Sequence, residues 1–140
     1  MTLTAHYNAF KTLLAGGILA GKVHDGVRLN KDGSPVRDNY AVLMPTTPRL
    51  LDGRFMEVGD ASADATYRFD VRYVGTTVAA VLMWQDAGRA RVLGERLAVA
   101  GRNCGPIRAV DGIEEDIYRR DQSADLFYVD ETYEFVSWRA

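Results

Sequence analysis

The sequence predicts an α+β fold in which two helices pack on one face of a mainly antiparallel β-sheet, forming a two-layer sandwich. Apolar side chains recur at helical spacing near the start of the chain, whereas residues 66–75 (TYRFDVRYVG) alternate between apolar and polar side chains. A second stretch with helical spacing follows Gly75. Because the expected order is helix, strand, loop or hairpin, strand, helix, strand, strand, the helices can cover one face while the other stays available.

A single domain over residues 1–140 fits the length and composition. Of the 140 residues, 47% are hydrophobic and 26% are charged, which is enough apolar material for one core. Cys104 is the single cysteine, so an intrachain disulfide is excluded. The opening residues carry only Lys11 before an apolar run that Gly16 and Gly17 interrupt, a pattern that predicts neither a signal peptide nor a membrane span. We therefore expect a soluble protein made in the cytoplasm.

The first helix is expected over roughly residues 4–20. Its apolar stripe has i, i+4, i+7, i+11 spacing and consists of Leu3, Tyr7, Phe10, Leu14 and Ile18. Gly16 and Gly17 weaken its last turns, and the helix can end there. A turn-rich stretch follows, with a tight turn at Asp32-Gly33.

A short buried strand is expected at residues 40–45 (YAVLMP), where the proline ends it. Residues 46–64 contain two glycines, one proline and no steady period, which indicates a long loop or a hairpin. Within this segment Phe55 and Met56 are apolar residues without an obvious place in a core.

The alternating stretch predicts a half-buried strand followed by a long helix. One face of the strand carries Tyr67, Phe69, Val71 and Tyr73, and the other carries Arg68, Asp70 and Arg72. Thr76 or Thr77 can cap a helix from about residue 78 to residue 100, which Gly101 and Asn103 would close. Its apolar stripe consists of Val78, Val81, Leu82, Val92, Leu93 and Leu97. Residues 105–121 add one or two short strands.

The final strand, residues 125–138 (DLFYVDETYEFVSW), contains carboxylates among aromatic residues. Alternation places Asp130 and Glu134 on the face that Arg68 and Arg72 take, so cross-strand ion pairs form if the two strands are antiparallel neighbours. Outward charges also keep an exposed strand from pairing indiscriminately. Glu131 falls on the apolar face, which predicts a β-bulge at Asp130-Glu131 or a position beyond the edge of the core.

The charge is polarised along the chain. Residues 111–134 carry nine acidic residues against two arginines, a net charge of −7, while the remainder carries 15 basic and 10 acidic residues, a net charge of +5. Such a subunit could repel polyanions with one region and meet the acidic face of a neighbour with the other. The alternative is a solvated acidic face with no partner.

Sequence patterns for catalysis are weak. His6, His24 and Cys104 are scattered without ligand spacing, so we expect no metal site from them and no cofactor. Glu114, Glu115 and Asp116 form the best acidic cluster, and paired carboxylates could bind a hard cation or act as acid and base. Arg119 and Arg120 alongside favour simple ion pairing instead. A small cation-dependent enzyme or ligand-binding domain stays as the alternative from a different class.

The order of elements resembles that of the tail terminator (head–tail joining) proteins of long non-contractile-tailed bacteriophages, or siphophages. The resemblance covers most of the chain and rests on the N-terminal helix, the proline-terminated strand, YRFDVRYVG leading into a helix, and the closing DLFYVDETYEFVSW strand. It implies a structural virion protein rather than an enzyme. Members form a homo-oligomeric ring, typically a hexamer, that caps the tail tube, stops its elongation and joins the tail to the head connector.

The resemblance also implies partners and a location. The partners would be other copies in the ring, the tail tube protein and the connector or stopper protein. DNA would pass through the channel without specific binding, no membrane would be involved, and the protein would lie in the tail or neck of the virion. Another neck or tail-completion component is the alternative within this class.

Two groups of residues are candidates for these contacts. The first is expected at a subunit or tube interface and comprises Arg54, Phe55, Met56, Arg68, Arg72, Asp130 and Glu134. The second would face the channel and comprises Glu114, Glu115 and Asp116, since an acidic lining does not hold DNA tightly.

Overall fold

Two long antiparallel strands, β4 (Ala65–Gly75) and β8 (Leu126–Arg139), form the centre of the sheet. The computed structural model describes residues 2–26, 28–34, 36–46, 49–50, 64–110, 119–121 and 125–139. Within these ranges the sheet has the order β1-β2-β4-β8-β5, with β3 also on β4, and β6 and β7 also on β8. Every strand pair is antiparallel except β1 with β2, so the expected α+β fold with a mainly antiparallel sheet is confirmed.

The remaining elements are short, apart from two helices. The strands are β1 (Val23–His24), β2 (Tyr40–Pro45), β3 (Arg49–Leu50), β5 (Arg102–Cys104), β6 (Arg108–Ala109) and β7 (Arg119–Asp121). The helices are α1 (Thr2–Leu14) and α2 (Val78–Val92), with a short 3-10 helix, η1 (Gly17–Leu19), between α1 and β1. Strand β2 has the predicted bounds, and β3 lies at the start of the segment expected to be a loop or hairpin.

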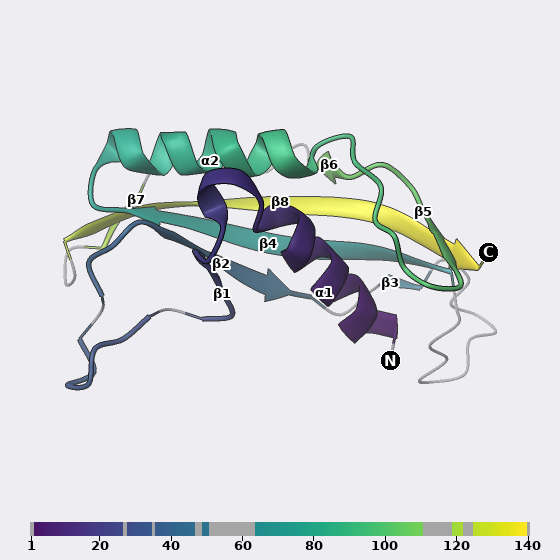
Figure 1. The fold of residues 1–140 in the computed structure, drawn as a ribbon, viewed down its shortest axis with the longest axis horizontal. Helices are drawn as coiled ribbons and strands as arrows, with labels where there is room; N and C mark the ends of the chain where they lie inside the picture. The colour runs from purple at the N-terminus through teal and green to yellow at the C-terminus, as the bar shows by residue number, and fades with distance from the viewer. Residues whose placement is uncertain are drawn as a thin grey trace.

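Both helices pack on the same face of the sheet (Figure 1), as the sequence predicts. α2 runs along β4 and β8, and α1 lies obliquely beside it. The main core lies between the layers and takes the inward residues of β4 together with side chains from both helices. Its fully buried members include Phe10, Leu14, Phe69, Val71, Tyr73, Val81, Val92 and Tyr133.

Both helices are shorter than expected. α1 ends at Leu14, and Gly17, at φ +62°, turns the chain into η1; Ile18, expected in the apolar stripe, is exposed. α2 ends at Val92 because the next residues bond elsewhere: Gly94 N donates to Ile107 O at 2.8 Å, and Ile107 N donates to Glu95 O at 2.9 Å. Leu97 is still buried, although it lies outside the helix. Asn103, expected to close the helix, lies in β5.

Thr77 is the N-cap of α2, and its hydroxyl accepts a hydrogen bond from Ala80 N at 3.1 Å. Thr77→Ala should therefore lower the free energy of unfolding by about 1 kcal/mol, because a donor of the first turn loses its acceptor. Thr76→Ala is the matched control, since Thr76 uses its backbone N–H, and not its side chain, to reach Asn39. Urea denaturation followed by circular dichroism measures both; equal losses would contradict the assignment of the cap.

Candidate functional site

The face of the sheet turned away from the helices carries a row of paired charges on β4 and β8, the open-face ladder. Arg72 binds Asp130 through two hydrogen bonds, Nε to Oδ1 at 2.8 Å and Nη2 to Oδ2 at 3.1 Å. Arg68 Nε lies 3.0 Å from Glu134 Oε2. The predicted cross-strand ion pairs are thus confirmed, because the register places Arg72 opposite Asp130 and Arg68 opposite Glu134.

A further cation and a threonine complete the ladder. Arg108 of β6 reaches Glu134 from the other side, with Nη2 at 2.7 Å from Oε1. Thr132 Oγ1 donates to Asp70 Oδ1 at 2.6 Å. The ladder therefore holds three arginines and three carboxylates, a neutral set, so the ladder by itself gives no net attraction for a polyanion.

Glu134 accepts from two guanidiniums while only 10% of its side chain is exposed. Glu134→Gln should lower the free energy of unfolding by about 1 kcal/mol, because the neutral amide cannot form the two ion pairs. The loss stays small because water can solvate both exposed arginines in the variant. The loss should shrink in 1 M salt. Asp125→Asn is the control, because Asp125 forms an exposed ion pair with Arg37 at 3.4 Å. A Glu134 variant as stable as the wild type in low-salt urea denaturation would rule out this contribution.

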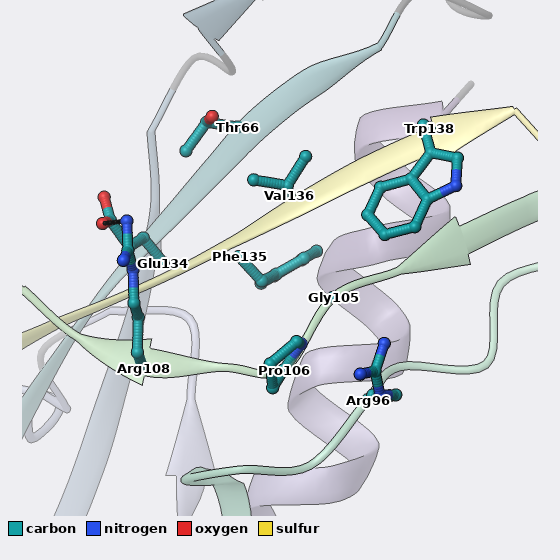
Figure 2. A pocket seen from close by; sticks show the side chains of 9 residues that line it. All are labelled: Thr66, Arg96, Gly105, Pro106, Arg108, Glu134, Phe135, Val136 and Trp138. Carbon is teal, nitrogen blue, oxygen red and sulfur yellow. Dashed lines mark ion pairs between the residues drawn. The ribbon is translucent and has the colours of Figure 1, made fainter.

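An apolar pocket of about 340 Å³ lies beyond the ladder, near the end of β8. Figure 2 shows the indole of Trp138 and the side chain of Val136 on one side of it and Pro106 on the other. Gly105 holds the two sides close together: its N–H donates to Val136 O at 2.8 Å, and an added Cβ would lie 3.7 Å from the Trp138 ring. Arg96 and Arg108 lie at the rim, so the pocket combines an apolar lining with cationic edges.

The predicted bulge at Asp130-Glu131 is wrong. β4 and β8 keep one uninterrupted register from Ala65↔Ser137 to Gly75↔Phe127, with Glu131 opposite Val71 on the helix side. The carboxylate is tolerated there because α2 supplies its partners: Gln85 Nε2 donates to Oε2 at 3.0 Å, and Arg89 Nε lies 3.5 Å from Oε1. The i, i+4 spacing of Gln85 and Arg89 was the sequence signal for this arrangement.

A buried tyrosine pair lies next to Glu131 under α2. Tyr73 Oη and Tyr133 Oη are 2.7 Å apart, and both side chains are fully buried. Burial raises the pKa of both hydroxyls well above the usual range, so both stay protonated at neutral pH. Since no solvent reaches them, this pair links β4 to β8 within the core and is not open to a substrate.

A second buried polar cluster joins α1 to the end of the sheet. His6 Nε2 lies 2.8 Å from Ser137 Oγ, which also accepts from Arg102 Nε at 2.9 Å. The His6 ring stacks on Tyr67 with the ring centroids 3.9 Å apart. Burial raises the pKa of the nearby Cys104 thiol, which keeps it protonated and a poor nucleophile. Because His6 and Ser137 are fully buried, the cluster holds the fold together rather than forming an open serine–histidine site.

Other candidate residues lie outside the described ranges. These are Arg54, Phe55 and Met56 of the expected interface, and Glu114, Glu115 and Asp116 of the acidic cluster. Within the described ranges, no group of three or more His, Cys, Asp or Glu side chains is placed to hold a metal ion. None of the helices in those ranges has the length and apolar content needed to cross a lipid bilayer.

Arg96, Arg108 and the pocket were not predicted from the sequence. The position of Trp138 could have been predicted, because strand alternation from Glu134 places residues 136 and 138 on the open face. Arg108 gave no such signal, since only the pairing of β6 with β8 places it opposite Glu134.

Comparison with known proteins finds similarity in fold but no match in sequence. No protein-family model matches the chain, and no curated protein sequence matches it. Among solved structures, a chain of "Virion of native gene transfer agent (GTA) particle" superimposes with a TM-score of 0.61 at 17% sequence identity, over 94% of this chain and 92% of that chain. Over nearly its whole length, therefore, this chain has the fold of a protein from that particle.

Proposed function

We propose that this protein is a structural component of a phage-like virion, and within that class a tail terminator. The observation that carries the proposal is the fold shared with a chain of the gene transfer agent particle over 94% of this chain. The sequence resemblance to tail terminators, found in the order of elements and in the β4 and β8 sequences, points to the same class independently.

In this role, copies of the chain form a closed ring, expected to be a hexamer, that caps the finished tail tube and meets the head connector. The protein is then a non-enzymatic part of the tail or neck, and DNA passes through the ring without specific binding. The neutral open-face ladder is compatible with such a part, because its charges are compensated within the subunit. The acidic residues Glu114, Glu115 and Asp116 stay candidates for the channel lining.

The test combines mass measurement of the purified protein with negative-stain electron microscopy. Rings, or tubes capped by rings when the tail tube protein is added, are the expected result. Rings that bind a connector protein but never a tube would favour another neck component. A strict monomer at every concentration, with and without tube protein, would overturn the proposal.

The cation-dependent alternative has a separate test. It requires a divalent cation to raise the melting temperature, and the double variant Glu114→Gln with Asp116→Asn to abolish that rise. Our proposal predicts that wild type and double variant melt alike with and without the cation. A cation-dependent rise confined to the wild type would contradict it.

A further inference from the structure

The outer face of α2 presents apolar side chains to solvent. Met83 is 52% exposed and Leu82 is 37% exposed, and Asp86 lies one turn further along the helix, also exposed. Leu82 was expected in the core stripe, but α2 buries Val81, Trp84, Gly88 and Val92 instead. We call Leu82, Met83 and Asp86 the helix knob. Two adjacent exposed apolar side chains beside a carboxylate indicate a contact surface.

The pocket at the end of β8, which we call the strand-end pocket, complements the helix knob because it has an apolar lining with cationic edges. Trp138 is 38% exposed, although it is the largest apolar side chain in the pocket lining, and Pro106 and Val136 lie beside it. A volume of about 340 Å³ is at the small end of the range for ligand sites, and it suits one or two protein side chains. An exposed tryptophan in a pocket that arginines also line is a common composition of an interface anchor.

The charges around the pocket are unbalanced in favour of the cations. Glu134 is the carboxylate in the lining, and it is already shared between Arg68 and Arg108. Arg96 forms no ion pair within the described residues and donates only to the carbonyl of Cys104, at 3.3 Å. Asp86 of the helix knob likewise forms no ion pair among the residues that the structure describes. A carboxylate next to apolar side chains therefore matches an apolar pocket edged by a guanidinium.

The helix knob lies on α2, in the helix layer (Figure 1), whereas the pocket residues Glu134, Val136 and Trp138 have the alternation of the open face of the sheet. They cannot meet within one subunit. We propose that the helix knob of one copy docks in the strand-end pocket of a second copy, with Leu82 and Met83 against Trp138 and Asp86 against Arg96. Because the two patches differ, the contact is head-to-tail, and repetition gives a ring if the rotation closes. This inference rests on the proposed ring and names the contact that builds it.

The experiment uses one variant blocked at each surface, Met83→Glu for the helix knob and Trp138→Glu for the strand-end pocket. Each alone should raise the concentration at which the protein assembles by about tenfold or more, as measured by light scattering after gel filtration. Mixed together they should form a 1:1 heterodimer and nothing larger, because only one intact knob and one intact pocket remain. Leu29→Glu is the control, since Leu29 is exposed elsewhere and should leave assembly unchanged.

A charge exchange tests the polar half of the contact. Asp86→Arg and Arg96→Asp should each weaken assembly, and the two changes in one chain should restore it. Circular dichroism and melting curves confirm that each variant is folded. If the wild type forms rings and both blocked variants form them equally well, this contact is wrong while the proposed function stands. If the wild type forms only open filaments, and both blocked variants abolish them, the proposed contact is supported and the proposed terminator ring is wrong.

Discussion

Gly88→Ala is expected to destabilise the protein by about 1–3 kcal/mol. A Cβ at residue 88 would lie 2.1 Å from Tyr73 Oη and 2.6 Å from two atoms of the same ring, so α2 must move away from the sheet. Overpacking of a core costs about 1–3 kcal/mol, and losing the buried Tyr73–Tyr133 hydrogen bond adds about 1 kcal/mol. The higher helix propensity of alanine returns about 1 kcal/mol at most. Guanidinium denaturation followed by circular dichroism measures the loss.

Two variants show whether the contact with Tyr73 is the cause. In a Tyr73→Phe background the nearest oxygen is absent, so Gly88→Ala should cost clearly less, which a double-mutant cycle detects as coupling. Ala90→Gly on the exposed side of α2 measures the backbone contribution alone, expected to be a loss of about 1 kcal/mol. A Gly88→Ala protein at least as stable as the wild type would show that α2 does not lie this close to the sheet.

His6→Ala is expected to lower the free energy of unfolding by about 3 kcal/mol. The ring is fully buried and stacks on Tyr67, so its removal leaves a cavity and deprives Ser137 of a partner 2.8 Å away. His6→Phe keeps an aromatic ring, slightly larger than imidazole, in place of the cavity and loses the polar contact with Ser137, which should cost about 1–2 kcal/mol.

His24→Ala serves as the control for the other histidine. His24 lies at the edge strand β1 and is partly exposed, so the loss should stay below about 1 kcal/mol. Urea denaturation at pH 8, where both histidines are neutral in the unfolded chain, compares the three variants. The three losses should rank His6→Ala, His6→Phe, His24→Ala, and equal losses would contradict the anchoring of α1 through His6.

Local patterns in the sequence were enough to predict the strands at the centre of the sheet. Strand β2 has the predicted bounds, β4 begins one residue before the expected stretch, and Thr77 is one of the two predicted caps. The period of two along β4 and β8 also placed Arg68 and Arg72 on the same face as Asp130 and Glu134, and the register of the two strands then decides the individual pairs. These features are predictable because neighbouring residues alone decide them: alternation assigns the faces, and glycine, proline and threonine mark the ends.

The tertiary structure decided where the helices stop and which groups contact the Glu131 carboxylate. α2 ends eight residues before the expected position because the backbone of Ile107, in a later segment, bonds to the residues that would continue the helix. It accepts from the N–H of Gly94 and donates to the carbonyl of Glu95. Glu131 needs no bulge because Gln85 and Arg89 reach it from α2. The strand-end pocket exists because the segment from β5 to β6 brings Gly105, Pro106 and Arg108 alongside the end of β8. Each depends on which distant segment lies opposite, and local periodicity carries no information about that.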